Sequence, residues 1–290
     1  MLNNYWVRKS VMLLLILVTL VSVSFSVGAS TYIYNLEWED NVLIEKPLDV
    51  MTRKKDKIVS VTFLDTLDDA PQNPWHLGPR GAKDSVQGWI EWKSGKGYAY
   101  IAAEGGINGK DACDELFMEC ESLQEIHFNG AFHTDKAESM VNMFYMCYDL
   151  EEVDLENLNT SNVESMYQMF RNCSSLEKVN LSKMDTSRVE TMYCMFSTCS
   201  SLEELDLRSF DTSNVTNMAY MFSACSALES VDVSSFDTSK VTTMAGMFRW
   251  CSKLKVYNFD NWDVSQVENY SGFMNSGMKI NGKKWENFFK

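Results

Sequence analysis

The side chains most able to do chemistry are eight cysteines. Six of them recur every 26 or 27 residues, at Cys120, Cys147, Cys173, Cys199, Cys225 and Cys251. Cysteines can bind zinc, but a zinc site needs closely spaced ligands, and these positions lack a histidine partner. Adjacent repeats would bring them near enough for disulfides by distance alone. However, each one falls on an apolar stripe, where cysteine usually packs as a small buried hydrophobe. We therefore predict a structural ladder of free, buried thiols.

Other reactive side chains lack the partners that catalysis needs. We expect Cys194 to face solvent and Cys113 to lie outside the repeat register, and neither has the histidine or asparagine partner of a cysteine nucleophile. Residues 105–111 superficially resemble a phosphate-binding loop, but the spacing is one residue short and Asp111 stands where Ser or Thr should bind magnesium. The three histidines show no catalytic or metal-binding spacing. We predict no catalytic residue, no cofactor and no enzymatic activity.

The carboxylates recur in columns along the repeats. Lys and Arg number 26 against 40 Asp and Glu, and this net charge of -14 disfavours binding to nucleic acid or to anionic lipid. A catalytic carboxylate pair needs two unequal members, whereas these columns repeat with one period. The candidate partner-binding residues are Glu151, Glu152, Asp154, Glu177, Glu203, Glu204, Asp206, Glu229 and Asp232.

These columns admit three interpretations. Stacked carboxylates repel one another, so the columns could form a docking face for a basic segment of a protein. Calcium could instead bridge adjacent carboxylates. The third interpretation is a solvated polar surface that keeps an extended repeat protein soluble. The sequence leaves all three open.

The elements that position these columns are repeats of 26 residues, such as SLEELDLRSFDTSNVTNMAYMFSAC. Leu202, Leu205 and Leu207 have the spacing of a short strand with one apolar face. Thr212 or Ser213 could cap a helix, and apolar residues within 215–225 follow one helical stripe. We therefore predict an α/β solenoid of leucine-rich-repeat-type strand–turn–helix units, preceded by a small β-rich cap region.

The predicted organisation has four parts. Residues 1–29 have the pattern of a signal peptide cleaved after Ala29, with an uncleaved membrane anchor as the alternative. Residues 30–112 form the cap, residues 113–277 about six repeats, and residues 278–290 a C-terminal tail. Within the cap we expect strands at 57–64, 86–92 and 98–103. Its tryptophans could form an aromatic binding patch or pack the cap itself: Trp75, Trp89 and Trp92.

One motif of the repeats resembles a known family. Phe-Asp-Thr-Ser-x-Val-x-x-Met-x-x-Met-Phe-x-x-Cys is complete at residues 210–225 and 236–251, with near copies beginning at Met184 and Leu158. It resembles the motif of the BspA-like leucine-rich repeat surface proteins, which are exported proteins of mostly host-associated bacteria. The resemblance implies an adhesin that binds host matrix proteins or other bacteria.

Taken together, these features predict a secreted or cell-surface protein that binds an extracellular protein through its repeats. Possible partners are a host matrix protein or another bacterial surface. Membrane contact is expected only through the N-terminal segment, if it stays uncleaved. One alternative is a structural envelope component without a host ligand. Another is a secreted enzyme with its site in residues 57–112.

Overall fold

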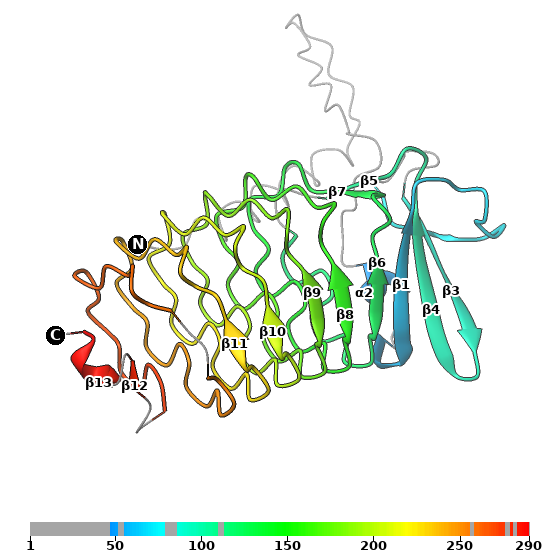
Figure 1. The fold of residues 1–290 in the computed structure, drawn as a ribbon. Helices are drawn as coiled ribbons and strands as arrows, with labels where there is room; N and C mark the ends of the chain where they lie inside the picture. The colour runs from blue at the N-terminus through cyan, green and yellow to red at the C-terminus, as the bar shows by residue number, and fades with distance from the viewer. Residues whose placement is uncertain are drawn as a thin grey trace, which may run out of the picture. The chain divides into compact units, whose positions relative to one another are not determined.

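The computed structural model describes residues 47–51, 55–78, 86–109, 113–255, 258–275, 279–280 and 283–289 (Figure 1). The expected signal peptide lies outside these residues. The chain from Trp38 to Lys290 forms one compact unit. Within the described residues, no helix is both long enough and apolar enough to cross a membrane.

The cap is a small sheet with two short helical segments before it. Its elements are α2 (Pro47–Met51), the 3-10 helix η1 (Lys55–Lys57), β1 (Ile58–Leu64), β2 (Trp75–His76), β3 (Gln87–Lys93) and β4 (Lys96–Ala102). The three strands expected in this region are therefore confirmed, as β1, β3 and β4. β3 and β4 pair antiparallel through a hairpin whose turn residues, Ser94 and Gly95, both have positive φ.

The cap sheet continues into the repeats without a break. β1 pairs in parallel with β4 on one side and with the first repeat strand on the other. The sheet order is β2-β3-β4-β1-β6-β8-β9 (Figure 1). β1 therefore closes what would otherwise be an open strand edge at the first repeat.

We call each repeat a rung, and five successive rungs each contribute one short parallel strand. The strands are β6 (Glu125–His127), β8 (Glu152–Asp154), β9 (Lys178–Asn180), β10 (Glu204–Leu205) and β11 (Ser230–Val231). Glu125, Glu152 and Lys178 stand opposite one another, so equivalent residues align from rung to rung. Two further strands, β5 (Ile107–Asn108) and β7 (Phe132–His133), also pair in parallel. The C-terminal elements are β12 (Lys279–Ile280), β13 (Lys283–Lys284) and the 3-10 helix η2 (Trp285–Asn287).

The expected strand–turn–helix unit is wrong, because residues 215–225 and their equivalents form a series of tight turns. Apart from α2 and the two 3-10 helices, the described residues contain short strands, isolated bridges and turns. Thr212 caps no helix. Its hydroxyl is buried and donates a hydrogen bond to the Asp237 carbonyl of the next rung, at 3.0 Å. The protein is a β-rich stack of rungs and not an α/β solenoid.

Two backbone features explain this correction. Alternate amides of the segment donate to the next rung: Met218 to Thr243, Tyr220 to Ala245, Phe222 to Met247 and Ala224 to Arg249. An α-helix would use these same amides within its own segment. Two residues per rung are also left-handed, as at Tyr220 (φ 57°) and Ala224 (φ 61°). That conformation interrupts a right-handed helix.

One apolar core runs through the cap and all the rungs. Phe117, Phe144, Phe170, Phe196, Phe222 and Phe248 stack in sequence. Neighbouring ring centroids lie 5.0 to 5.9 Å apart, and the ring planes diverge by 13° at most. Phe63 of β1 joins this stack, 6.2 Å from Phe117. The two methionines of the repeat motif form two further columns, and these are fully buried beside the stack.

Candidate functional site

The cysteine column holds the rungs together. The six cysteines of this column form no disulfide and are buried, as predicted. From Cys147 onward, each column thiol donates to the carbonyl of the phenylalanine one rung before. Cys199 Sγ, for example, lies 3.2 Å from Phe170 O. The equivalent contacts of Cys147, Cys173, Cys225 and Cys251 measure 3.0 to 3.1 Å. Cysteine suits this position because its side chain is small enough to be buried and its thiol is a weak hydrogen-bond donor.

The same burial makes these thiols poor nucleophiles. It raises the pKa of the Cys147, Cys173 and Cys225 thiols well above the ordinary value. At Cys251 burial raises the pKa to about 12. Reactivity resides in the thiolate, so the column has a structural role.

Two cysteines differ from their expected positions. Cys194 was expected to face solvent, but only 4% of its surface is exposed, because the side chains of Tyr193, Arg171 and Ser197 lie against it. Cys113 was placed outside the repeat register. Instead its amide bonds to the Ser139 carbonyl, just as Met140 bonds to Ser165, so Cys113 takes the place of the first repeating methionine.

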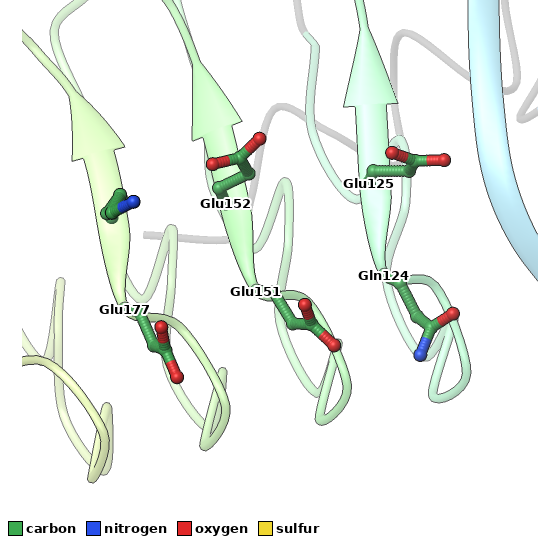
Figure 2. Close-up of a pocket in the computed structure, with 6 residues that line it drawn as sticks. Gln124, Glu125, Glu151, Glu152 and Glu177 are labelled. Carbon is green, nitrogen blue, oxygen red and sulfur yellow. The ribbon is translucent and has the colours of Figure 1, made fainter.

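The acidic columns lie along the strands, and we call Gln124, Glu151, Glu177, Glu203 and Glu229 with their neighbours Glu125, Glu152 and Glu204 the acidic face. The glutamates among them are exposed. An open depression is lined by Gln124, Glu125, Glu151, Glu152, Glu177 and Lys178. Figure 2 shows two levels of side chains there, one from Gln124, Glu151 and Glu177 and the other from Glu125 and Glu152. The backbone links the first level, because the Glu177 amide donates to Glu151 O at 2.9 Å.

The aspartates among the predicted partner-binding residues have a different role. Asp154, Asp206 and Asp232 each accept a hydrogen bond from the amide two residues later, and so close the turn after the strand. The side-chain hydrogen bond from Arg208 lowers the pKa of Asp206 to about 2. A hydrogen bond from the Ser234 side chain lowers the pKa of Asp232. These three aspartates are occupied with local structure, which separates them from the glutamates.

Basic side chains contact the acidic face at its two ends. Lys255 Nζ lies 3.5 Å from Glu229, and His127 Nε2 lies 3.3 Å from Glu125. Lys178 also lines the depression. No cation of the described residues pairs with Glu151, Glu177 or Glu203. Neighbouring strands are about 4.8 Å apart, so these carboxylates repel one another. Among the described residues, no group of three or more His, Cys, Asp or Glu could hold a metal ion.

The cap tryptophans divide between packing and exposure. Trp89 is buried and stacks on Tyr100 at 5.2 Å. Trp75 and Trp92 expose 41% and 47% of their surface. Trp89 therefore packs the cap, while Trp75 and Trp92 remain on its surface.

The sequence reasoning missed one group of surface residues on the turns. Trp250 is 57% exposed, and the Arg249 guanidinium lies 4.3 Å from its ring centroid. Tyrosines occupy the same turns on earlier rungs, where Tyr167 and Tyr193 stack at 5.0 Å. The available signal was a lack of acidic residues: 166–175, 192–201, 218–227 and 244–253 contain neither Asp nor Glu.

Comparison with known proteins identifies one family. Residues 111–205 and 178–288 match the family model described as Mycoplasma protein of unknown function, DUF285. The two ranges together span more than half of the chain. No curated protein matches, and no solved structure matches.

Proposed function

The chain belongs to the DUF285 family of Mycoplasma proteins, and we propose that it is a non-enzymatic binding protein. Its acidic face captures a basic segment of an extracellular protein. The observation that carries this proposal is the run of exposed glutamates on successive rungs without cation partners among the described residues. A basic segment would relieve their mutual repulsion, and charge complementarity would favour encounter and register.

The extracellular setting of this proposal rests on two features of the sequence. One is the signal-peptide pattern of residues 1–29, and the other is the resemblance of the repeat motif to exported BspA-like surface proteins. A secreted or surface-displayed protein would meet host matrix proteins and other bacterial surfaces. Immunodetection in intact cells, in permeabilised cells and in culture medium tests this setting, and a signal that appears only after permeabilisation would contradict it.

A peptide-binding experiment tests the acidic face. The probe is a fluorescein-labelled peptide of alternating lysine and tyrosine, and its binding to the purified protein is followed by fluorescence anisotropy. The triple variant Glu151→Gln, Glu177→Gln, Glu203→Gln should weaken binding about tenfold, because three exposed charge contacts contribute about 0.5 kcal/mol each.

The matched control removes three carboxylates away from the strands. Glu138, Glu190 and Glu268 are exposed on the turn segments, and their change to Gln alters the net charge by the same amount. The control triple should bind the peptide almost as well as the wild type. Equal weakening by both triples would mean that only net charge matters, and the acidic face would lose its role.

A further inference from the structure

A second surface lies on the turn segments. Its members lie on the turns of successive rungs, and we call them the tyrosine–arginine strip: Tyr145, Tyr167, Arg171, Tyr193, Tyr220, Arg249 and Trp250. The Arg171 guanidinium lies 5.9 Å from the Tyr145 ring, and Tyr193 links Tyr167 (5.0 Å) to Tyr220 (6.0 Å). Arg249 and Trp250 complete it on the rung after Tyr220.

The charges of the strip are distinctive in this acidic chain. Four arginines lie in the described part of the chain, and two of them, Arg188 and Arg208, pair with carboxylates at 2.6 Å. Arg171 and Arg249 lie against aromatic rings, and neither forms an ion pair with a described residue. The turns that carry them contain no carboxylate of their own. Among the described arginines, the two without a carboxylate partner are thus both carried by turns that lack acidic residues.

The tyrosines of the strip are packed. All four are half-buried, Tyr167 and Tyr193 stack on one another, and Tyr220 meets the Tyr193 ring edge to face. Gly246 makes room for one of them, since a Cβ at this position would come within 2.4 Å of the Tyr220 ring. Ordered aromatic rings provide contact area at little entropic cost on binding. Aromatic residues and arginine are enriched in protein interfaces, whereas Lys, Glu and Asp are depleted there.

We propose that the tyrosine–arginine strip binds an acidic segment of a partner protein. The two guanidinium groups meet its carboxylates, and the tyrosine and tryptophan rings cover its apolar side chains. The strip comes from different residues of each rung than the acidic face does, so this binding is independent of the function proposed above. At physiological salt the Debye length is about 8 Å, which screens the net negative charge of the remaining surface.

The test uses a fluorescein-labelled peptide of alternating glutamate and tyrosine, followed by fluorescence anisotropy at physiological salt. The wild-type protein should bind it, and the double variant Arg171→Gln, Arg249→Gln should bind at least about fivefold more weakly, through loss of two charge contacts. Trp250→Ser should also weaken binding. Because Trp250 is exposed, this substitution leaves the core intact. Circular dichroism confirms that each variant is folded.

The matched control is Arg188→Gln, Arg208→Gln, which removes two cations outside the strip and should leave binding unchanged. Equal weakening by both doubles, or no binding by the wild type, overturns the proposal. Binding of a heparin oligosaccharide that depends on Arg171 and Arg249, without peptide binding, would assign the strip to glycans instead. Self-association in sedimentation velocity that the strip double abolishes would assign it to a second copy of the chain. The lysine–tyrosine peptide should bind the strip double normally, so the two proposed surfaces can fail separately.

Discussion

At the scale of single residues, the repeating polar side chains serve mainly to join one rung to the next. The column cysteines donate to phenylalanine carbonyls, and the motif threonines donate to the carbonyl of the next rung's Asp or Asn. The motif aspartates close turns, as Asp211 does with the Ser213 amide at 2.9 Å. For cysteine, threonine and aspartate, the repeat of the residue therefore reflects a hydrogen bond that repeats from rung to rung.

The thiol column leads to the first prediction. Burial raises the pKa of its thiols, so at pH 8 the folded protein should react very slowly with a water-soluble disulfide reagent such as DTNB. Denaturant should expose eight reactive thiols, the full cysteine content of the chain. Absorbance of the released thiolate measures both states. Rapid reaction of more than one or two thiols in the folded protein would contradict the buried column.

The Asp206–Arg208 pair predicts a small dependence of stability on pH. The folded pKa of Asp206, about 2, lies below the value of about 3.9 expected in the unfolded chain. The resulting stabilisation is present above pH 4 and is lost as the pH falls toward 2. Since the pair is exposed, solvent screening should keep its contribution small.

The variant Asp206→Asn tests this dependence by urea unfolding at pH 7 and at pH 3. Asparagine keeps a side-chain oxygen for the turn but removes the charge. The variant should lose less stability than the wild type between the two pH values. An identical loss in both proteins would show that the pair does not contribute.

At the scale of the element, each turn of the rung depends on bonds to its neighbour. Thr186 is buried, and its hydroxyl both donates to Asp211 O and accepts from the Asp211 amide, each at 2.8 Å. Thr186→Val keeps the shape but removes both hydrogen bonds to the Asp211 backbone, which should lower the free energy of unfolding by about 1–3 kcal/mol. Thr186→Ser keeps the hydroxyl and should cost less. Equal losses in urea denaturation would refute the hydrogen-bonding role.

The Gly246–Tyr220 contact predicts coupling between two adjacent turns. Gly246→Ala should destabilise the protein by about 1 kcal/mol or more, because the added Cβ meets the Tyr220 ring. Tyr220→Ala removes that ring, so Gly246→Ala should cost less in the Tyr220→Ala background, where only the strain of the left-handed backbone (φ 60°) remains. A double-mutant cycle of unfolding free energies measures the difference. Additive losses would show that the ring does not limit this position.

The sequence predicted the strands and the columns of this element but not its turn segment. A period of two within the strands and identical columns between rungs are visible in the residues themselves. Buried residues at 215, 218, 221, 222 and 225 fit a helix equally well. In the sequence, only the residues at left-handed positions could distinguish the turns from a helix. They are Gly at 246 and 272 and Asn at 142 and 172, but Tyr220 gives no such signal.

The candidate site was predictable to a similar extent. The alignment of Glu125, Glu152 and Lys178 follows from the repeat period and is present in the structure. The division of the carboxylates into free glutamates and turn-closing aspartates was not predicted, because it depends on hydrogen bonds within each turn. The strip was missed because its residues differ from rung to rung and share only the lack of acid.

At the scale of the whole molecule, cap and rungs share one core and one sheet. Phe63 is fully buried and contacts the rings of Phe117, Phe128 and Phe132. Phe63→Ala should therefore lower the free energy of unfolding by about 3–5 kcal/mol. In the wild type, tryptophan fluorescence and far-ultraviolet circular dichroism should report a single urea transition. Two separated transitions would show that cap and rungs unfold independently.

The rung-to-rung hydrogen bonds also bear on how such a chain can change its length. Each middle rung contacts the rung before it and the rung after it through the same atoms, so its two faces match those of any other middle rung. Deleting or duplicating a whole unit of 26 residues would join surfaces that already fit one another. Unequal recombination between the repeated gene segments would then yield folded proteins that are shorter or longer by whole rungs, with the cap and the final rung unchanged.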